Sequence, residues 1–252
     1  MKKWMVFCMT ALFPQTPWAA DIQATLQWSQ RVELSTPVSG TVQAVDVEVG
    51  DRVKQGQVLL SLDGTIYQAR VAESQSAINR LNAEAEEDKR ELDRVMELHE
   101  RTVVATTELD QAKLKLVRSQ STLSEAHARL RQNQKALDDA SIRAPFDAVV
   151  VIRQAEPGLS VAAGLQPQML LTLARSGEMI ARMHLTSPQI ANLKTGQTLT
   201  VSVAGMNYTG KIRTLGLEPV KIKEESVYPV DVVFPGKEQP LRAGTPALVK
   251  LP

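Results

Sequence analysis

Histidine, a residue type that often catalyses reactions or binds metals, occurs only three times in this 252-residue chain, at positions that stand far apart. The three histidines are His99, His127 and His184. None of them has a second ligand at the spacing of a metal site, so His99 and His127 are expected to be exposed helix residues. Four methionines offer soft sulfur ligands, namely Met169, Met179, Met183 and Met206. Their spacing is more typical of the core of a β-barrel.

The carboxylates also lack the arrangement of an acid–base pair. Asp138-Asp139 and residues 84–88 are acidic runs on stretches with helical periodicity, where they are expected to form solvated faces. The sequence contains no Ser/His/Asp arrangement and no phosphate-cradling glycine loop. We therefore predict that the protein is not an enzyme, that it holds no metal or cofactor, and that it acts by binding.

Residues 1–20 have the pattern of a secretory signal peptide. Lys2 and Lys3 precede a short apolar run at residues 4–13, and Ala19-Ala20 form a small-residue end. The apolar run is too short to span a bilayer. The cleavage site is imperfect, which leaves an uncleaved anchor as the alternative. We predict an exported protein.

The single cysteine and the charge balance argue against three further classes of protein: lipoproteins, disulfide-bonded proteins and nucleic-acid-binding proteins. Cys8 does not follow a small residue, so we do not expect it to be lipidated, and the mature chain then has no cysteine for a disulfide. Without Lys2 and Lys3, the 29 basic residues become 27 against 28 acidic ones. This balance gives no indication of nucleic-acid binding.

Two long stretches have the periodicity of paired helices. Residues 67–98 and 109–140 each place mostly apolar or small residues at every third or fourth position, and no proline interrupts either stretch. Only a short break at residues 101–106 separates them. We predict an antiparallel α-helical coiled-coil hairpin over residues 67–140, which makes a rod of about 48 Å at 1.5 Å per residue.

One antiparallel register satisfies both stretches, because the numbers of facing residues add to 207 or 208 along the whole rod. This register sets Asp88 opposite Ser119 and Ser74 opposite Asn133, so that the polar interruptions of the two seams face each other. The first helix carries nine acidic residues and the second carries six basic ones, which favours the same pairing. A long helix that dimerises with another chain is the alternative, and the constant sum argues against it.

The residues on either side of the hairpin repeat one pattern. In each half a glycine follows a proline by 13 residues, and a second glycine follows six residues later. These residues are Pro37, Gly50 and Gly56 in the first half and Pro145, Gly158 and Gly164 in the second. We predict that residues 34–66 and 141–175 are the halves of one β-sandwich, because half-sheets left apart would have open edges. The shared core is expected to contain Val42, Val53, Val149 and Val161.

The C-terminal part has the pattern of a small β-domain. Residues 176–252 contain five short alternating segments with glycines between them, which indicates a small antiparallel β-barrel. The predicted fold class is therefore mixed α and β, elongated and modular. A split sandwich with an inserted helical hairpin is followed by the barrel, and residues 21–33 are left as an N-terminal segment.

The two halves resemble those of lipoyl and biotinyl domains. The hairpin inserted between them resembles the periplasmic adaptor family (membrane fusion proteins, HlyD-like) of tripartite efflux pumps. The family phrase APFDG stands here at residues 144–148 with Ala148 in place of the glycine. A lipoyl or biotinyl carrier needs an exposed lysine between its halves, whereas residues 62–65 lead directly into the first helix. No attached cofactor is therefore expected.

The resemblance covers residues 34–252 and implies a periplasmic adaptor that links an inner-membrane transporter to an outer-membrane channel for the export of small molecules. It also implies a homo-oligomer, a trimer or a hexamer. The hairpin length favours a transporter of the resistance-nodulation-division type. An ATP-driven exporter is one alternative, and a free-standing periplasmic coiled-coil module without a pump is another. The family's membrane-proximal domain is expected to be absent, because only about 13 mature residues precede the first half.

The resemblance also implies where the channel binds. Adaptors of this family often carry Arg-x3-Leu-x6-Ser near the hairpin tip, and Arg94 and Leu98 match this motif while alanine replaces the serine. The predicted docking site, called here the tip site, consists of Arg94, Leu98, Val103, Val104, Ala105 and Thr106. The alternative is that Leu98 only closes the coiled coil and that Arg94 pairs with Glu97 or Asp110.

Overall fold

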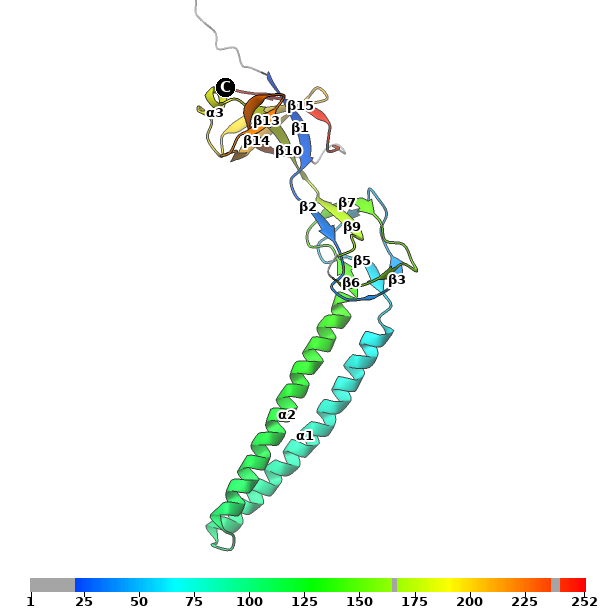
Figure 1. The fold of residues 1–252 in the computed structure, drawn as a ribbon, viewed down its shortest axis with the longest axis vertical. Coiled ribbons are helices and arrows are strands. Elements are labelled where there is room, and N and C mark those ends of the chain that lie inside the picture. The colour runs from blue at the N-terminus through cyan, green and yellow to red at the C-terminus, as the bar shows by residue number, and fades with distance from the viewer. Residues whose placement is uncertain (1–20, 165–166, 237–240) are drawn as a thin grey trace, which may run out of the picture. The chain divides into compact units, whose positions relative to one another are not determined.

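The computed structural model describes residues 21–164, 167–236 and 241–252 (Figure 1). The predicted signal peptide at residues 1–20 lies outside them. The described chain divides into two compact units. One is Arg31–Ala174, and the other joins the residues up to Gln30 with Arg175–Pro252. Among the described residues, no helix has the length and apolar character needed to span a membrane.

The unit of residues 31–174 contains a β-sandwich of two four-stranded sheets. Its strands are β2 (Arg31–Leu34), β3 (Gly40–Val45), β4 (Arg52–Val53), β5 (Val58–Leu62), β6 (Ser141–Arg143), β7 (Ala148–Arg153), β8 (Ser160–Val161) and β9 (Leu171–Arg175). The sheet orders are β2-β9-β7-β4 and β6-β5-β3-β8. Each strand of the first half thus pairs with a strand of the second, which confirms the predicted split sandwich.

The core of the sandwich is shared by both halves, as predicted, with one difference. Val42, Val53 and Val161 are buried in it, but Val150 takes the place expected for Val149. Side chains alternate along β7, so Ala148 and Val150 face the core while Val149 is only half-buried. The predicted alternation was therefore one residue out of phase in this strand.

The inserted hairpin consists of α1 (Thr65–Glu100) and α2 (Thr106–Asp139), which lie side by side as the cyan and green helices of Figure 1. Its seam buries Ile78, Leu81 and Ala85 from α1. At the base, the Leu62 N–H donates to the Ala140 carbonyl at 2.8 Å, so the two ends of the insertion are joined directly. The hairpin is antiparallel, as predicted.

Two polar layers interrupt the apolar seam where the register predicts them. The Asn133 side-chain amide donates to the Ser74 hydroxyl at 2.7 Å. Farther along, the carboxylate of Asp88 is buried, lies 2.8 Å from the Lys115 ammonium and accepts a hydrogen bond from Ser119. The Lys115 ammonium and then the Ser119 hydroxyl hold the pKa of Asp88 below its usual range, although burial acts in the opposite direction. Asp88 therefore stays ionised at neutral pH.

The other unit is a β-barrel. Its strands are β1 (Asp21–Trp28), β10 (Glu178–Leu185), β11 (Thr198–Val203), β12 (Met206–Leu215), β13 (Val220–Ile222), β14 (Glu225–Pro235) and β15 (Pro246–Lys250), with a short helix α3 (Ser187–Ile190). Six strands close the barrel in the order β10-β1-β15-β11-β12-β14, because β14 pairs back onto β10. The seventh strand, β13, pairs only with β14.

Strand β1 is part of this barrel, although the sequence analysis began the barrel at residue 176. It lies between β10 and β15, and Ala24 faces Met183 on one side and Ala247 on the other. Its inward side chains Ala24 and Leu26 are buried in the barrel core. The segment left undefined at residues 21–33 is thus divided between the barrel and β2 of the sandwich.

The register leads to a cross-linking prediction. In this register Leu81 and Ala126 face each other, so cysteines at both positions are expected to oxidise to a disulfide within one chain. Non-reducing electrophoresis of the full chain measures this as a faster-migrating monomer. Cysteines at the outward-facing Ser76 and Ser121 are the control and should form no such bond. Cross-links found only between chains from the 81/126 pair would contradict the hairpin topology.

Candidate partner-docking site

The end of α1 is shaped by two backbone hydrogen bonds at the tip site. The Thr102 N–H donates to the His99 carbonyl at 2.9 Å, and the Val103 N–H donates to the Leu98 carbonyl at 3.0 Å. Together they form a Schellman motif, which requires a left-handed residue after the helix. That residue is Thr102, with φ of 59°. Glycine is usual at this position, and a β-branched threonine is strained there.

A third contact closes the turn onto α2. The Nδ1 atom of His99 lies 3.1 Å from the Val104 carbonyl oxygen, within hydrogen-bonding distance. Ala105 then stands at the N-cap of α2, in an extended conformation, and its carbonyl accepts the Glu108 N–H at 3.1 Å. Serine caps this position far better than alanine because its hydroxyl can accept a backbone N–H. The serine of the family motif would therefore stand at the N-cap of α2, where this chain has Ala105. Thr106 cannot replace it, because it is the first residue of the helix and not its N-cap.

The residues of the tip site differ in exposure. The Val103 side chain is 68% exposed, Val104 and Leu98 are half-buried, and Ala105 and Thr106 are exposed. An apolar valine at the end of a rod has no neighbour within its own hairpin that covers it. A single exposed apolar residue is common on protein surfaces, so Val103 does not by itself mark a docking site.

Arg94 lies on α1, about two turns before its end, and it is held loosely. Its Nη1 donates to the Glu91 carboxylate at 2.6 Å, and its side chain stays 61% exposed. The pairing expected under the alternative interpretation does not form. Glu97 pairs with Arg101 at 2.6 Å, and Asp110 lies 3.9 Å from the ammonium of Lys113. Among the described residues the other nitrogens of the Arg94 guanidinium have no hydrogen-bond partner, so they can donate to a partner.

The histidines and methionines singled out in the sequence do not cluster in the structure. His99 lies at the tip, His127 on α2 and His184 on β10, and within the described ranges no three His, Cys, Asp or Glu residues could hold a metal ion. Met179 and Met183 are buried in the barrel core as predicted. Met169 belongs to the other unit and Met206 is exposed, so for these two the prediction of barrel core is wrong.

Comparison with known proteins agrees with this geometry. The pattern of the CzcB-like barrel-sandwich hybrid domain matches residues 30–166, more than half of the chain. The chain belongs to this family. The residues matched cover the hairpin and every strand of the sandwich except β9, and this is the architecture on which the sequence resemblance rested. The resemblance to membrane fusion proteins is thereby confirmed.

Individual relatives match over most of the chain. The macrolide export protein MacA of Yersinia pestis is 28% identical over 239 residues, which cover 88% of this chain and 64% of MacA. The pyoverdine export membrane fusion protein PvdR of Pseudomonas aeruginosa is 26% identical, over 80% of this chain and 56% of PvdR. The chain thus spans less than two thirds of the length of either relative.

The fold of this barrel-sandwich hybrid protein has a close match among solved structures. The membrane fusion protein Spr0693 of Streptococcus pneumoniae R6 has a TM-score of 0.72 at 18% sequence identity, and the match covers 92% of this chain and 97% of that one. At this identity the match bears on the fold alone, and it supports the predicted fold class.

Two residues that shape the tip site were missed by the sequence analysis. His99 was expected to be an exposed helix residue, yet it contacts the Val104 carbonyl. Thr102 was not singled out, although the turn after α1 depends on its left-handed backbone conformation, with φ of 59°. The usual signal for such a turn is glycine, and without one the sequence gives no local sign of it.

The strain at Thr102 predicts the effect of one substitution. Thr102→Gly should stabilise the hairpin by about 0.5–1 kcal/mol, because glycine takes a left-handed φ without steric cost but loses more chain entropy on folding. The midpoint of thermal loss of helical circular dichroism measures this. Thr122→Gly, an exposed position within α2, is the control and should lower the midpoint. A Thr102→Gly variant that also melts earlier would contradict the strained turn.

Proposed function

We propose that the protein is the periplasmic adaptor subunit of a tripartite efflux system. In this role it bridges an inner-membrane transporter and an outer-membrane channel, and it serves the export of small molecules. The observation that carries the proposal is the hairpin itself. It is inserted in a barrel-sandwich hybrid domain and ends in a tip with an exposed valine and an exposed arginine.

The tip site supplies the contact with the channel in this proposal. Val103 offers an apolar side chain that is 68% exposed, and Arg94 offers guanidinium donors that can bind carbonyls or carboxylates of a facing helix. The shape of the turn is held by the backbone, so the site is preorganised before it meets the channel. The missing serine at Ala105 removes one hydrogen bond that the resembling motif offers.

The other partners follow from the family and from the sequence. MacA and PvdR are named for the export of a macrolide and of pyoverdine, which supports small-molecule export here. Hairpin length favours a transporter of the resistance-nodulation-division type over an ATP-driven exporter, and this choice stays a prediction. The proposed location is the periplasm, reached by the signal peptide, with the chain assembled as a trimer or hexamer.

Charge reversal at Arg94 tests the docking role. Arg94→Asp removes an exposed ion pair worth at most about 1 kcal/mol to folding. It should cost about 2 kcal/mol of docking free energy, ~30-fold in affinity, because arginine is often a dominant residue at interfaces. In a strain that lacks the adaptor, we expect the variant to be folded, exported and unable to restore efflux.

The matched control is Arg80→Asp. Arg80 is on the same helix, 70% exposed and 3.7 Å from the Glu84 carboxylate, but it lies far from the tip. This variant should restore efflux fully. If Arg94→Asp restored efflux as well as Arg80→Asp at equal protein levels, the tip site would not be the docking surface.

A further inference from the structure

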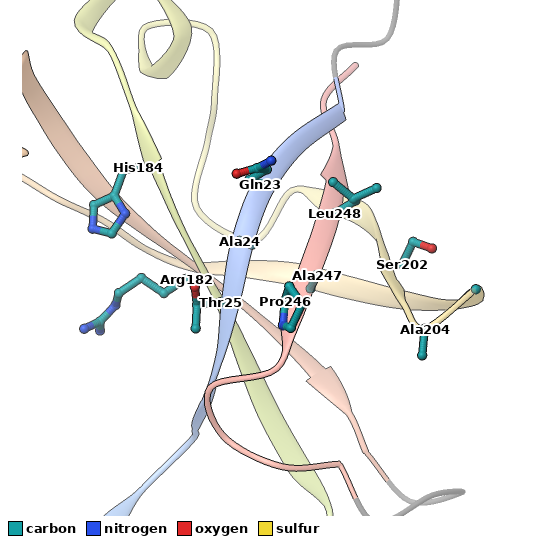
Figure 2. Close-up of a pocket in the computed structure, with 11 residues that line it drawn as sticks. Gln23, Ala24, Thr25, Arg182, His184, Ser202, Ala204, Pro246, Ala247 and Leu248 are labelled. Atoms are coloured by element: carbon teal, nitrogen blue, oxygen red, sulfur yellow. The ribbon is translucent and has the colours of Figure 1, made fainter. Parts of the chain in front are cut away.

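The barrel has an open hollow on its outer wall, and Figure 2 shows the side chains that line it. The hollow has a volume of about 570 Å³ and is lined by residues of β1, β10, β11 and β15 and of the turn after β11. Arg182 in this wall binds the Asp231 carboxylate of the neighbouring strand through Nε and Nη2, at 2.7 and 2.8 Å. Because the carboxylate cancels the guanidinium charge, the hollow does not form an anion site around Arg182.

In the other unit, the hairpin leaves the sandwich through two unequal joints. On the α2 side, the buried Ala140 alone separates the helix from β6, and its carbonyl accepts the Leu62 N–H at 2.8 Å. On the α1 side, the Asp63 N–H still donates to the Thr41 carbonyl at 2.8 Å, so Gly64 is the link between sheet and helix. Glycine gives such a link conformational freedom. The direction of the hairpin therefore depends on what else holds the first turn of α1.

Tyr67 holds this first turn. Its hydroxyl donates to the Ser39 carbonyl of the sandwich at 2.6 Å. Its ring is half-buried and packs against the sandwich core, whereas the preceding residue, Ile66, is 65% exposed. Among the described residues, no ion pair joins either helix to the sandwich. Tyr67 thus ties α1 to the sandwich both by packing and by a hydrogen bond.

The acceptor of this hydrogen bond is fixed within the sandwich. Ser39 immediately precedes β3, whose first residue, Gly40, pairs with Val161 of β8. The Ser39 hydroxyl also accepts the Ala163 N–H at 2.9 Å. The Ser39 carbonyl is therefore held by β3 on one side and by the residues after β8 on the other.

The donor is fixed within the hairpin. The guanidinium carbon of Arg70 lies 5.9 Å from the centre of the Tyr67 ring, which is a cation–π distance. The Arg70 carbonyl accepts hydrogen bonds from the Ser74 hydroxyl at 2.9 Å and from the Asn133 amide at 3.3 Å. Ser74 and Asn133 form a polar layer that joins α1 to α2. The tether at Tyr67 therefore acts on both helices of the hairpin.

A small tilt at the base of the hairpin displaces the tip site by a large distance. α1 has 36 residues, so at about 1.5 Å per residue the tip lies roughly 54 Å from the base, and a tilt of about 10° would move it by roughly 9 Å. The hydrogen bond between Tyr67 and Ser39 is open to solvent, so water competes for both groups. It can break without unfolding the sandwich or the hairpin.

We propose that Tyr67 is a positioning residue, whose hydroxyl fixes the direction of the hairpin on the sandwich and with it the place of the tip site. While the Tyr67 hydroxyl binds the Ser39 carbonyl, α1 and α2 leave the sandwich in one direction. When the bond breaks, the hairpin pivots at Gly64 and Ala140, and the polar layers keep its register. A preorganised tip loses less entropy when a partner binds it. This consequence for docking rests on the proposed function, whereas the positioning itself does not.

Spin labels in the purified full chain with Cys8→Ser measure the direction of the hairpin. One pair, Arg52→Cys with Ser121→Cys, has exposed positions on β4 and α2 and therefore spans the sandwich and the hairpin. A second pair, Ser76→Cys with Ser121→Cys, lies within the hairpin. Tyr67→Phe removes the hydroxyl and keeps the ring. It should widen the distance distribution of the 52/121 pair at least twofold and leave that of the 76/121 pair unchanged.

Tyr208→Phe is the matched control, because this hydroxyl belongs to the barrel unit and lies 3.9 Å from the Met206 sulfur. It should leave both distributions unchanged. If Tyr67→Phe kept the 52/121 distribution narrow while Tyr67→Leu widened it, the ring and not the hydroxyl would position the hairpin, and the proposal would be overturned. Equal widening of both pairs in Tyr67→Phe would also overturn it, because the hairpin itself would then be loosened. These measurements need no channel, so they can fail while the tip site still docks.

Discussion

The pairing of the two sandwich halves across the inserted hairpin is the constraint on which the rest of the structure depends. Leu60 of β5 faces Ile142 of β6, and Arg52 of β4 faces Val149 of β7, so neither half completes a sheet without the other. This pairing brings the two ends of the insertion together and forces α1 and α2 to return to one base. The sandwich thus supports the hairpin, and the hairpin in turn positions the tip site.

Within the hairpin, the register is set by polar residues at a cost in apolar burial. The Asn133 amide reaches Ser74, and the buried Asp88 is compensated by Lys115 and Ser119. A shift of the helices would leave the Asp88 charge buried without a partner, which is strongly unfavourable. The register of α1 and α2 is kept along the rod up to the turn, where Thr102 adopts a left-handed conformation. A rod with a fixed register presents the same tip to every partner.

The helical hairpin and the repeat of the two sandwich halves could be predicted from the sequence, because each extends over many residues. Local departures from ideal geometry could not be predicted. The hairpin register could be predicted because Ser74 and Asn133 break two heptads at matching places. Val149 was chosen over Val150 because both fit a run of valines, and only the pairing of β7 decides which faces inward. The barrel strand β1 was missed because its partners, β10 and β15, lie more than 150 residues away along the chain. The turn at Thr102 was missed because the chain uses no glycine there.

The measurement that tests the central claim most directly is photo-cross-linking at the tip in intact cell envelopes. A photoreactive residue at Val103, which is 68% exposed, should form an adduct with an outer-membrane channel protein. The same residue at the exposed Gln132, near the base of the rod, should form none. A channel adduct from Val103 alone is the result that this account predicts. Channel adducts from Gln132 but not from Val103, or none from either site at normal protein levels, would contradict it.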